Sequence, residues 1–235
     1  MTTVLLTGSS RGIGAAAAAL LRERGARVIG QSTRGGGDAL AADFSVPDAA
    51  RSLWRDALDR SGGAIDVLVN NAGVFVPNPL TSEDEAWSVV WAENMQVNLT
   101  AAAELSRLAV LHWLERGVPG RIVHVASRAG HRGDSPDHWH YAAAKGGMLA
   151  LHKTIARGYA ARGILSFAVA PGFTDTAMAD DYLASRGGDG ILRDIPLGRV
   201  ATPEEIAVLI AFCALDAPPS MTGATLDANG ASHVR

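Results

Sequence analysis

The chain has 235 residues, 48% of them hydrophobic, and a formal net charge of −3. A chain of this length can bury a large core in one unit, so we expect a single domain over residues 1–235. Basic and acidic residues are interspersed, which argues against nucleic acid or an anionic membrane as a partner. No apolar stretch approaches the roughly 20 residues of a membrane span. We therefore expect a cytoplasmic protein that binds a small molecule.

Short apolar runs alternate with helix-like segments along the chain. The runs cover residues 3–7, 27–30, 66–70, 121–125 and 164–169, and the helix-like segments include residues 13–24 and 49–60. The runs are nearly continuous in Val, Ile and Leu, as in parallel strands that helices cover on both faces. The pattern predicts an α/β fold, a doubly wound parallel sheet of Rossmann-like type with helices on both faces. Ligands bind beyond the carboxyl ends of the strands in such sheets.

A glycine-rich segment, T-G-S-S-R-G-I-G, follows the first apolar run at residues 7–14 and precedes five alanines. Glycines there permit a tight turn and a close approach of the backbone to a pyrophosphate, and the start of a helix favours an anion. A plain structural turn is the alternative, but the strand before it and the helix after it favour a dinucleotide site. The residues expected to contact the dinucleotide here are Gly8, Ser10, Arg11, Gly12, Ile13 and Gly14.

The stretch H-W-H-Y-A-A-A-K at residues 138–145 brings two histidines, a tyrosine and a lysine together. Tyr141 and Lys145 are four residues apart, so a helix would place them on one face. His138 and His140 form a plausible pair of metal ligands. The stretch alone leaves three interpretations open: a metal site, a solvated helix face and an acid–base device.

Several motifs, in order over nearly the whole chain, resemble those of the short-chain dehydrogenase/reductase family. The glycine spacing Gly8-x-x-x-Gly12-x-Gly14 is one, and N-N-A-G at residues 70–73 is another. Further matches are N-L-T at 98–100, Ser127, Y-A-A-A-K at 141–145, A-P-G-F-T-D-T at 170–176, P-L-G-R at 196–199 and T-G at 222–223. The wording of the motifs is nearest to that of 3-oxoacyl-(acyl-carrier-protein) reductases.

The resemblance implies a catalytic set and a cofactor site. The implied catalytic residues are Asn98, Ser127, Tyr141 and Lys145, with Asn98 holding a water path to the lysine. Asp43 would contact the adenine, and Asn71, Ala72 and Gly73 would pack beside the adenosine. The nicotinamide end would be held by Tyr141, Lys145, Pro171, Gly172, Phe173, Thr174 and Thr176.

The resemblance also implies a substrate site and an assembly. The loop 128–140 would form one wall of the substrate pocket, and residues from about 177 to 195 would form a lid over it. The helical segments 101–114 and 142–160 would pack between subunits. We therefore expect a homotetramer or, failing that, a dimer.

The chemistry supports the catalytic set independently. Reduction of a ketone needs a proton donor at the developing alkoxide, and a free tyrosine with a pKa near 10 is too basic to cycle easily at neutral pH. We expect the charge of Lys145 to lower the pKa of Tyr141, because one charge about 4 Å away is worth about 4 kcal/mol at an effective dielectric near 20. Ser127 would donate a hydrogen bond that orients the substrate oxygen.

The nucleotide preference depends on the end of the second strand. NAD sites usually carry an acid there, but this chain reads G-Q-S-T-R at 30–34 and has no acid before Asp38. Arg11 and Arg34 are both candidates to pair with a 2′-phosphate, although either could be merely solvated. We predict NADP(H) as the preferred cofactor, with NAD(H) also possible.

Three departures from the family pattern concern the substrate pocket and subunit packing. The segment from Ser127 to Tyr141 is one residue longer than usual, His124 and Ala126 replace polar residues, and N-G-A at 229–231 lacks a second glycine. On paper, a metal site could be assembled from His131, His138, His140 and nearby acids. Hydride transfer with a tyrosine and a lysine needs no metal, so we expect none and leave the roles of these histidines open.

The sequence therefore predicts an NADPH-dependent oxidoreductase that reduces a ketone or aldehyde to an alcohol. One rival is an NAD(P)-linked alcohol or sugar-alcohol dehydrogenase that works mainly in oxidation. A rival of another class is a cofactor-binding regulator that has lost catalysis. Such a regulator should lack at least one of the four catalytic residues, and all four are present.

Overall fold

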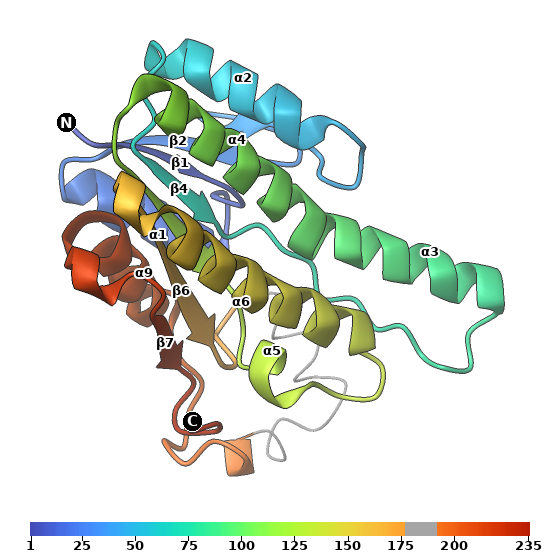
Figure 1. Ribbon diagram of the computed structural model, residues 1–235. Coiled ribbons are helices and arrows are strands. Elements are labelled where there is room, and N and C mark those ends of the chain that lie inside the picture. Colours follow the sequence, from blue (N-terminus) through green and yellow to red (C-terminus); the bar gives the residue numbers. More distant parts are fainter. Residues whose placement is uncertain (177–191) are drawn as a thin grey trace.

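The computed structural model describes residues 1–176 and 192–235, and its centre is a parallel sheet of seven strands (Figure 1). The strand order is β3-β2-β1-β4-β5-β6-β7, and every neighbouring pair runs parallel. The strands are β1 (Thr3–Leu6), β2 (Arg27–Ser32), β3 (Leu40–Ala41), β4 (Val67–Asn70), β5 (Gly120–Val125), β6 (Ile164–Pro171) and β7 (Thr225–Ala228). This sheet confirms the predicted fold class.

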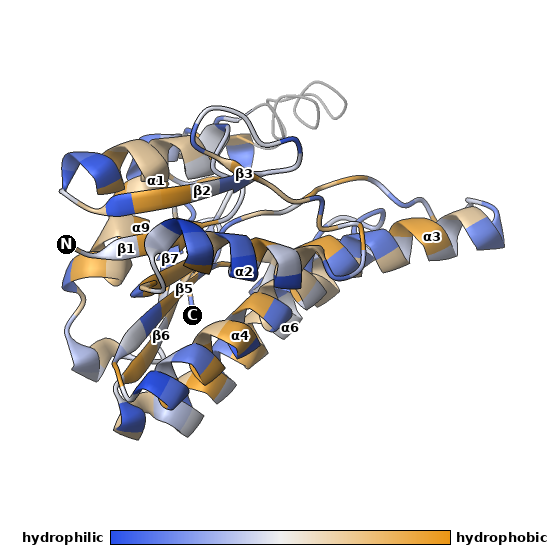
Figure 2. Ribbon diagram, turned by 90° about the horizontal axis from the view of Figure 1, so that it is seen from above, coloured by the Kyte–Doolittle hydropathy of each residue, from blue (hydrophilic) through white to orange (hydrophobic). Residues whose placement is uncertain are grey.

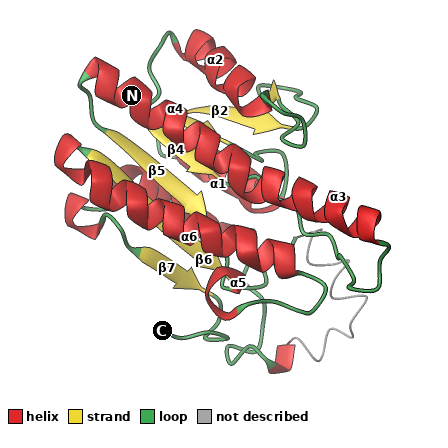
Figure 3. Ribbon diagram, turned by 45° about the vertical axis from the view of Figure 1, so that its right-hand side comes forward, coloured by secondary structure: helices red, strands yellow, loops and turns green. Residues whose placement is uncertain are grey.

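Helices cover both faces of the sheet (Figure 3). The α-helices are α1 (Gly12–Glu23), α2 (Ala49–Ser61), α3 (Asp84–Met95), α4 (Ala101–Arg116), α5 (Ala129–Arg132), α6 (Trp139–Tyr159) and α9 (Pro203–Ala211). Shorter elements are the π-helices Gln96–Thr100 and Phe212–Asp216 and the 3₁₀ turns Ala160–Arg162 and Pro219–Met221. None of the described helices is long and apolar enough to cross a bilayer.

Alternate residues of each central strand enter different cores. Val4 and Leu6 of β1 pack in the core beneath α1 and α9, whereas Leu5 packs in the core beneath α2 and α4. Successive side chains of a strand point to opposite faces, so a strand buried on both faces must be apolar throughout. This requirement explains the continuous runs of Val, Ile and Leu in the sequence.

The sequence did not indicate the two edge strands. β3 has only two residues, and β7 reads T-L-D-A with one exposed and three partly exposed positions. An edge strand has a single neighbour in the sheet and needs no continuous apolar run. The predicted run 27–30 also proved two residues short, because β2 continues through Gln31 and Ser32, whose side chains bind neighbouring backbone.

The strand order reverses between β1 and β4. The strands β2 and β3 lie on one side of β1, and the strands from β4 to β7 lie on its other side. Loops that leave the carboxyl ends of β1 and β4 therefore diverge, and a crevice opens between them. The helix α3 projects beyond the sheet on this side of the molecule (Figure 1; Figure 2).

Candidate active site

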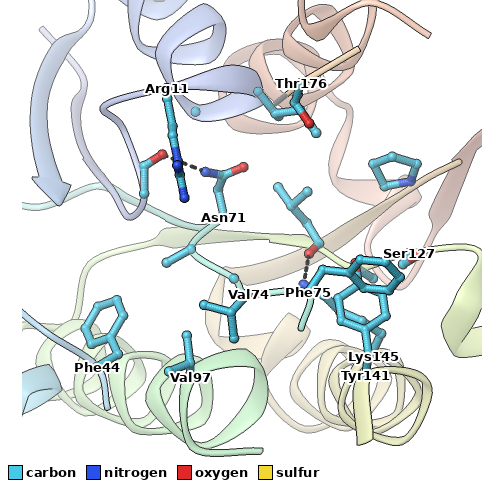
Figure 4. A pocket seen from close by; sticks show the side chains of 18 of the residues that line it. Arg11, Phe44, Asn71, Val74, Phe75, Val97, Ser127, Tyr141, Lys145 and Thr176 are labelled. Carbon is cyan, nitrogen blue, oxygen red and sulfur yellow. Dashed lines mark hydrogen bonds between the residues drawn. The ribbon is translucent and has the colours of Figure 1, made fainter. Parts of the chain in front are cut away.

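A cavity of about 490 Å³ lies at the carboxyl ends of the strands. Figure 4 shows Arg11, Asn71 and Thr176 on one side of it and Ser127, Tyr141 and Lys145 grouped on another. The predicted cofactor residues that line it are Gly8, Ser10, Arg11, Ile13, Gly14, Asp43, Asn71, Ala72, Gly73, Tyr141, Lys145, Pro171, Gly172, Phe173, Thr174 and Thr176. One continuous space thus joins the glycine-rich loop to the tyrosine and the lysine.

The glycine-rich loop is packed too closely for side chains. Gly8 has a φ of +65°, and a Cβ on Gly14 would overlap the carbonyl oxygen of Gly8. Asn71 braces this turn, because its Nδ2 donates to the carbonyl oxygens of Thr7 (2.9 Å) and Gly8 (3.0 Å). Gly12 does not line the cavity, and a Cβ on it would lie 3.0 Å from the Thr176 side chain. The loop therefore offers a bare backbone at the start of α1, which fits a pyrophosphate.

The end of β2 carries an amide where NAD sites usually have an acid. Gln31 accepts a hydrogen bond from the Gly8 amide (2.8 Å) and donates one to the Ala42 carbonyl (2.7 Å). Arg11 is exposed and lines the cavity, whereas Arg34 is exposed and is not among the lining residues. Of the two arginines that the sequence offers as partners of a 2′-phosphate, the structure thus brings only Arg11 to the cavity wall.

Asp43 lies at the same end of the cavity, and its carboxylate binds locally. Its Oδ1 accepts hydrogen bonds from the backbone nitrogen (3.0 Å) and hydroxyl (2.7 Å) of Ser45, and these bonds lower the pKa of Asp43. The carboxyl group is therefore held in one orientation beside the cavity wall. Together with the bare loop, this end of the cavity fits the adenosine half of a dinucleotide.

Ser127, Tyr141 and Lys145 come from two places in the fold, the end of β5 and the helix α6, and meet at the other end of the cavity. Ser127 follows β5, and its Oγ accepts a hydrogen bond from the Ala129 amide at 3.1 Å. Tyr141 and Lys145 lie one turn apart on α6, as predicted. The Lys145 ammonium donates to the Val125 carbonyl at 2.9 Å and lies 5.7 Å from the centre of the Tyr141 ring.

The pKa of Tyr141 differs from the expectation. Burial raises the pKa of Tyr141 to about 12, while a hydrogen bond with Ser127 opposes this rise. Burial also lowers the pKa of Lys145 to about 8. The expected lowering of the tyrosine pKa is wrong for this structure, because desolvation of the phenolate dominates and the ammonium is directed at the Val125 carbonyl.

Asn98 lies behind the cavity wall. It belongs to the π-helix between α3 and α4, where the chain departs from the α-helical pattern. Its Oδ1 accepts from the Val74 amide (3.0 Å), and its Nδ2 donates to the Val74 carbonyl (2.9 Å). A Cβ on Gly73 would lie 2.7 Å from the Asn98 Oδ1 and 3.7 Å from the Lys145 Nζ. Asn98 thus fixes the loop after β4 and is separated from Lys145 only by Gly73.

Aromatic rings support Tyr141 from the side. The Phe75 ring stacks on His138 with centroids 3.9 Å apart and meets the edge of the Tyr141 ring at 4.8 Å. His138 is buried, and its Nδ1 lies 2.7 Å from the Ser135 hydroxyl. His140 is also buried, and its Nδ1 accepts from the Tyr141 amide at 2.8 Å. Both histidines pack within the protein and do not line the cavity.

The predicted substrate loop 128–140 reaches the cavity through Arg128 and Asp134. The remaining residues of this loop lie behind the wall or on the surface. Among the described residues, no group of three or more His, Cys, Asp or Glu side chains could hold a metal ion. Of the predicted lid, residues 177–191 lie outside the described part of the chain.

The substitutions before Ser127 have different consequences. Ala126 lines the cavity, whereas His124 is fully buried and is not among the lining residues. The His124 ring lies 6.0 Å from that of His152, which contacts the Ser166 hydroxyl and the Gly223 carbonyl. His124 therefore belongs to a buried polar cluster beneath α4 and α6 and does not shape the cavity.

Several lining residues were not indicated by the sequence. They are Ala42, Phe44, Ser45, Val74, Phe75, Glu93, Val97 and Val125. Most lie in loops or on α3, where apolar periodicity carries no information on what they face.

Comparisons with known proteins agree with this architecture. A family described as Enoyl-(Acyl carrier protein) reductase matches residues 8–233. A 3-oxoacyl-[acyl-carrier-protein] reductase of Vibrio cholerae is 37% identical over 242 residues, which cover 98% of this chain and 96% of the relative. The corresponding reductase of Escherichia coli is 37% identical over 246 residues, with the same coverage. A cis-4-hydroxycyclohexanecarboxylate dehydrogenase of Sinomonas cyclohexanicum is 38% identical over 242 residues, covering 96% of this chain and 94% of the relative.

Proposed function

We propose, from the premise that the chain belongs to the short-chain dehydrogenase/reductase family of oxidoreductases, that it is an NADPH-dependent reductase of ketones and aldehydes. The observation that carries the proposal is the single cavity that runs from the glycine-rich loop to Ser127, Tyr141 and Lys145. A dinucleotide bound along the loop would direct its far end toward these three side chains. Substrate and cofactor would thus meet in one space.

The residues would divide the chemistry among them. A reduced nicotinamide, when bound, supplies the hydride. Tyr141 would donate its phenolic proton to the substrate oxygen as charge develops there, and a pKa of about 12 keeps that proton in place at neutral pH. Ser127 would donate a hydrogen bond to the same oxygen and orient it. Lys145, with its pKa of about 8, would be largely charged at neutral pH and would stabilise the phenolate left after proton transfer.

Asn98 would act through its neighbours. Its amide holds the Val74 backbone in both directions, which fixes Gly73 beside Lys145. We assign it the role of supporting the proton path to the lysine. In this proposal Asn98 is a positioning residue, since it does not line the cavity.

The preference for NADPH rests on charge at the adenosine end. The segment 30–34, where NAD sites usually carry an acid, has no carboxylate, and Gln31 in it bonds the Gly8 amide and the Ala42 carbonyl, so no acid in this segment would repel a 2′-phosphate. Arg11 lines the cavity at this end and can pair with a phosphate. Arg34 would contribute only through a longer-range charge interaction.

The substrate is a carbonyl compound or, in reverse, its alcohol. The relatives named above act, by name, on 3-oxoacyl groups and on a hydroxycyclohexanecarboxylate, so both reduction and oxidation occur among similar chains. A dehydrogenase that works mainly in oxidation is therefore the second candidate. An inactive regulator is disfavoured because Ser127, Tyr141 and Lys145 and the positioning residue Asn98 are all present.

We also propose self-association through α3, α4 and α6. These helices expose Val89, Leu111 and Trp139, with exposed fractions of 64%, 47% and 54%. Exposed apolar side chains on neighbouring helices are typical of an interface between subunits. A homotetramer is the expected assembly, with a dimer as the alternative.

The deciding experiment is an initial-rate screen of ketones and aldehydes with NADPH and NADH, and of alcohols with NADP⁺ and NAD⁺, monitored by nicotinamide absorbance. Carbonyl-dependent oxidation of NADPH supports the proposal. Activity confined to alcohols with NAD⁺ would favour the dehydrogenase instead. Cofactor binding without turnover of any compound would favour the regulator.

A further inference from the structure

Among the described residues, the buried charged side chains that line the cavity are all cations. Arg128 is 8% exposed and Lys145 is 3% exposed. The acidic residues that line the same cavity are all exposed, and they are Asp43, Glu93 and Asp134. A charge acts more strongly where the effective dielectric constant is low, so the two buried cations dominate the inner part of the cavity.

Arg128 is held firmly in the cavity wall. Its amide donates to the Pro171 carbonyl at 2.9 Å, and its carbonyl accepts from the His131 and Arg132 amides at 3.0 and 3.1 Å. Its guanidinium carbon lies 4.8 Å from the centre of the Phe173 ring. Stacking uses the flat face of a guanidinium, whereas its N–H donors lie in the plane of the group. The side chain is therefore both charged and pre-oriented.

Arg128 is also next to the reacting groups. It directly follows Ser127, and both residues line the cavity. Lys145, the other buried cation, has a role in the proposed proton transfer. Arg128 has no role in that chemistry, so its charge points to recognition of another part of the substrate.

We propose that Arg128 is a specificity-determining residue that binds the carboxylate of an oxo-acid substrate whose carbonyl lies at Ser127 and Tyr141. The inference rests on the proposed reductase function and narrows its substrate class. A carboxylate is chosen because its two oxygens match the planar donors of a guanidinium in a bidentate pair. Neutral ketones would lack this interaction.

The first test compares a matched pair of substrates. The wild-type enzyme and Arg128→Gln are assayed with NADPH on 4-oxocyclohexanecarboxylate and on its methyl ester, which keeps the ketone and removes the charge. We expect the wild type to favour the acid by at least about tenfold in kcat/KM, and we expect Arg128→Gln to lower the acid-to-ester ratio by at least about tenfold. Arg132→Gln is the control, since Arg132 ends the short helix α5 that follows Arg128, lies outside the cavity and pairs with Asp194.

The outcomes of this test are distinct. A wild type that favours the ester, or a ratio that Arg128→Gln leaves unchanged, overturns the proposal. A ratio lowered equally by Arg132→Gln also overturns it, because the effect would then be general. Arg128→Lys provides a second variant that keeps the charge and loses the bidentate geometry, and we expect an intermediate ratio.

The second test does not depend on turnover. Calorimetric titration of the wild type with cyclohexanecarboxylate and with the neutral cyclohexanecarboxamide, in the presence of NADP⁺, measures recognition of the charge alone. We expect the carboxylate to bind at least about tenfold more tightly than the amide and this difference to vanish in Arg128→Gln. Equal binding of the two compounds overturns the inference. Carboxylate binding that depends on Arg128, without any carbonyl reduction, would instead contradict the proposed function.

Discussion

The ammonium group of Lys145 lies 5.7 Å from the centre of the Tyr141 ring, one helical turn away on α6. Burial acts on the two groups in opposite directions, raising the pKa of Tyr141 to about 12 and lowering that of Lys145 to about 8. In both cases burial disfavours the charged form. The pair therefore holds a proton on the phenol across the neutral range and a charge on the lysine that is lost in mild alkali.

Tyr141→Phe keeps the ring that packs against Phe75 and removes the proton donor. NADPH should still bind with near-normal affinity, while kcat should fall by roughly 10² to 10⁴, the usual loss for general acid catalysis. Lys145→Ala should weaken both cofactor binding and turnover. Fluorescence titration and steady-state kinetics check the two effects separately. Near-normal turnover by Tyr141→Phe would refute the assigned proton donor.

The pH dependence of reduction should follow Lys145. Its pKa is lowered to about 8, so its charge is present below that pH and is lost as the pH rises through it. Without the charge, the phenolate left on Tyr141 is less stable, so kcat/KM for reduction should decline above about pH 8. A rate profile from pH 6 to 10 at saturating NADPH measures this. A profile that stays flat to pH 10 would count against the role of the lysine.

NADPH should bind at least about tenfold more tightly than NADH, because Arg11 lines the adenosine end and no acid lies at the end of β2. Arg11→Gln should remove most of this preference by weakening NADPH binding and sparing NADH. Arg34→Gln is a matched control, since Arg34 is exposed and outside the cavity, and it should have a smaller effect. Fluorescence titrations of the wild type and the two variants with both nucleotides supply the six affinities. Tighter binding of NADH to the wild type would contradict the assignment.

The sequence predicted the parts of this molecule that repeat a physical pattern. The central strands are buried on both faces and therefore read as apolar runs, and the glycine-rich loop is visible because side chains at Gly8 and Gly14 cannot be accommodated. The spacing of Tyr141 and Lys145 follows from one helical turn. These features are local, so the chain order of residues is enough to find them.

The remaining features depend on where loops fold back in space. Arg11 and Arg34 look equivalent in the sequence, yet only Arg11 lines the cavity. The stack of Phe75 on His138 joins residues more than sixty positions apart. The π-helix that places Asn98 behind Gly73 has no periodicity that separates it from the flanking helices. Such contacts are set by tertiary packing, and a single sequence does not encode them in a readable pattern.

The proposed self-association can be tested on one exposed leucine. Leu111 lies on α4 with 47% of its surface exposed, and a charge at an apolar interface between subunits is costly. Leu111→Glu should therefore lower the mass measured by light scattering at micromolar concentration, whereas the wild type should measure as a tetramer. Val46→Glu is the control, because Val46 is 54% exposed and lies in the loop before α2, not on α3, α4 or α6. A monomeric wild type would refute the assembly.

Acid should destabilise the fold through the buried pair His124 and His152. Burial lowers the pKa of His124 to about 3 and that of His152 to about 4, so both imidazoles stay neutral in the folded chain at pH 5. In the unfolded chain they titrate near 6.5 and bind protons as the pH falls below that value. The unfolded state then holds more protons, and stability must fall as the pH falls from about 7.5 to 5. Each histidine contributes about 2 kcal/mol over this range, or about 4 kcal/mol together.

Urea unfolding at pH 7.5 and at pH 5 measures this loss. His124→Gln should reduce the difference in unfolding free energy between the two pH values by about half, because one of the two titrating groups is gone. The absolute stability of this variant is also expected to be lower, so the comparison is made within each protein across pH. His112→Gln is the control, since His112 lies outside the buried pair and is only half-buried on α4. If His124→Gln shows the same pH difference as the wild type, the buried pair is not the source of acid sensitivity.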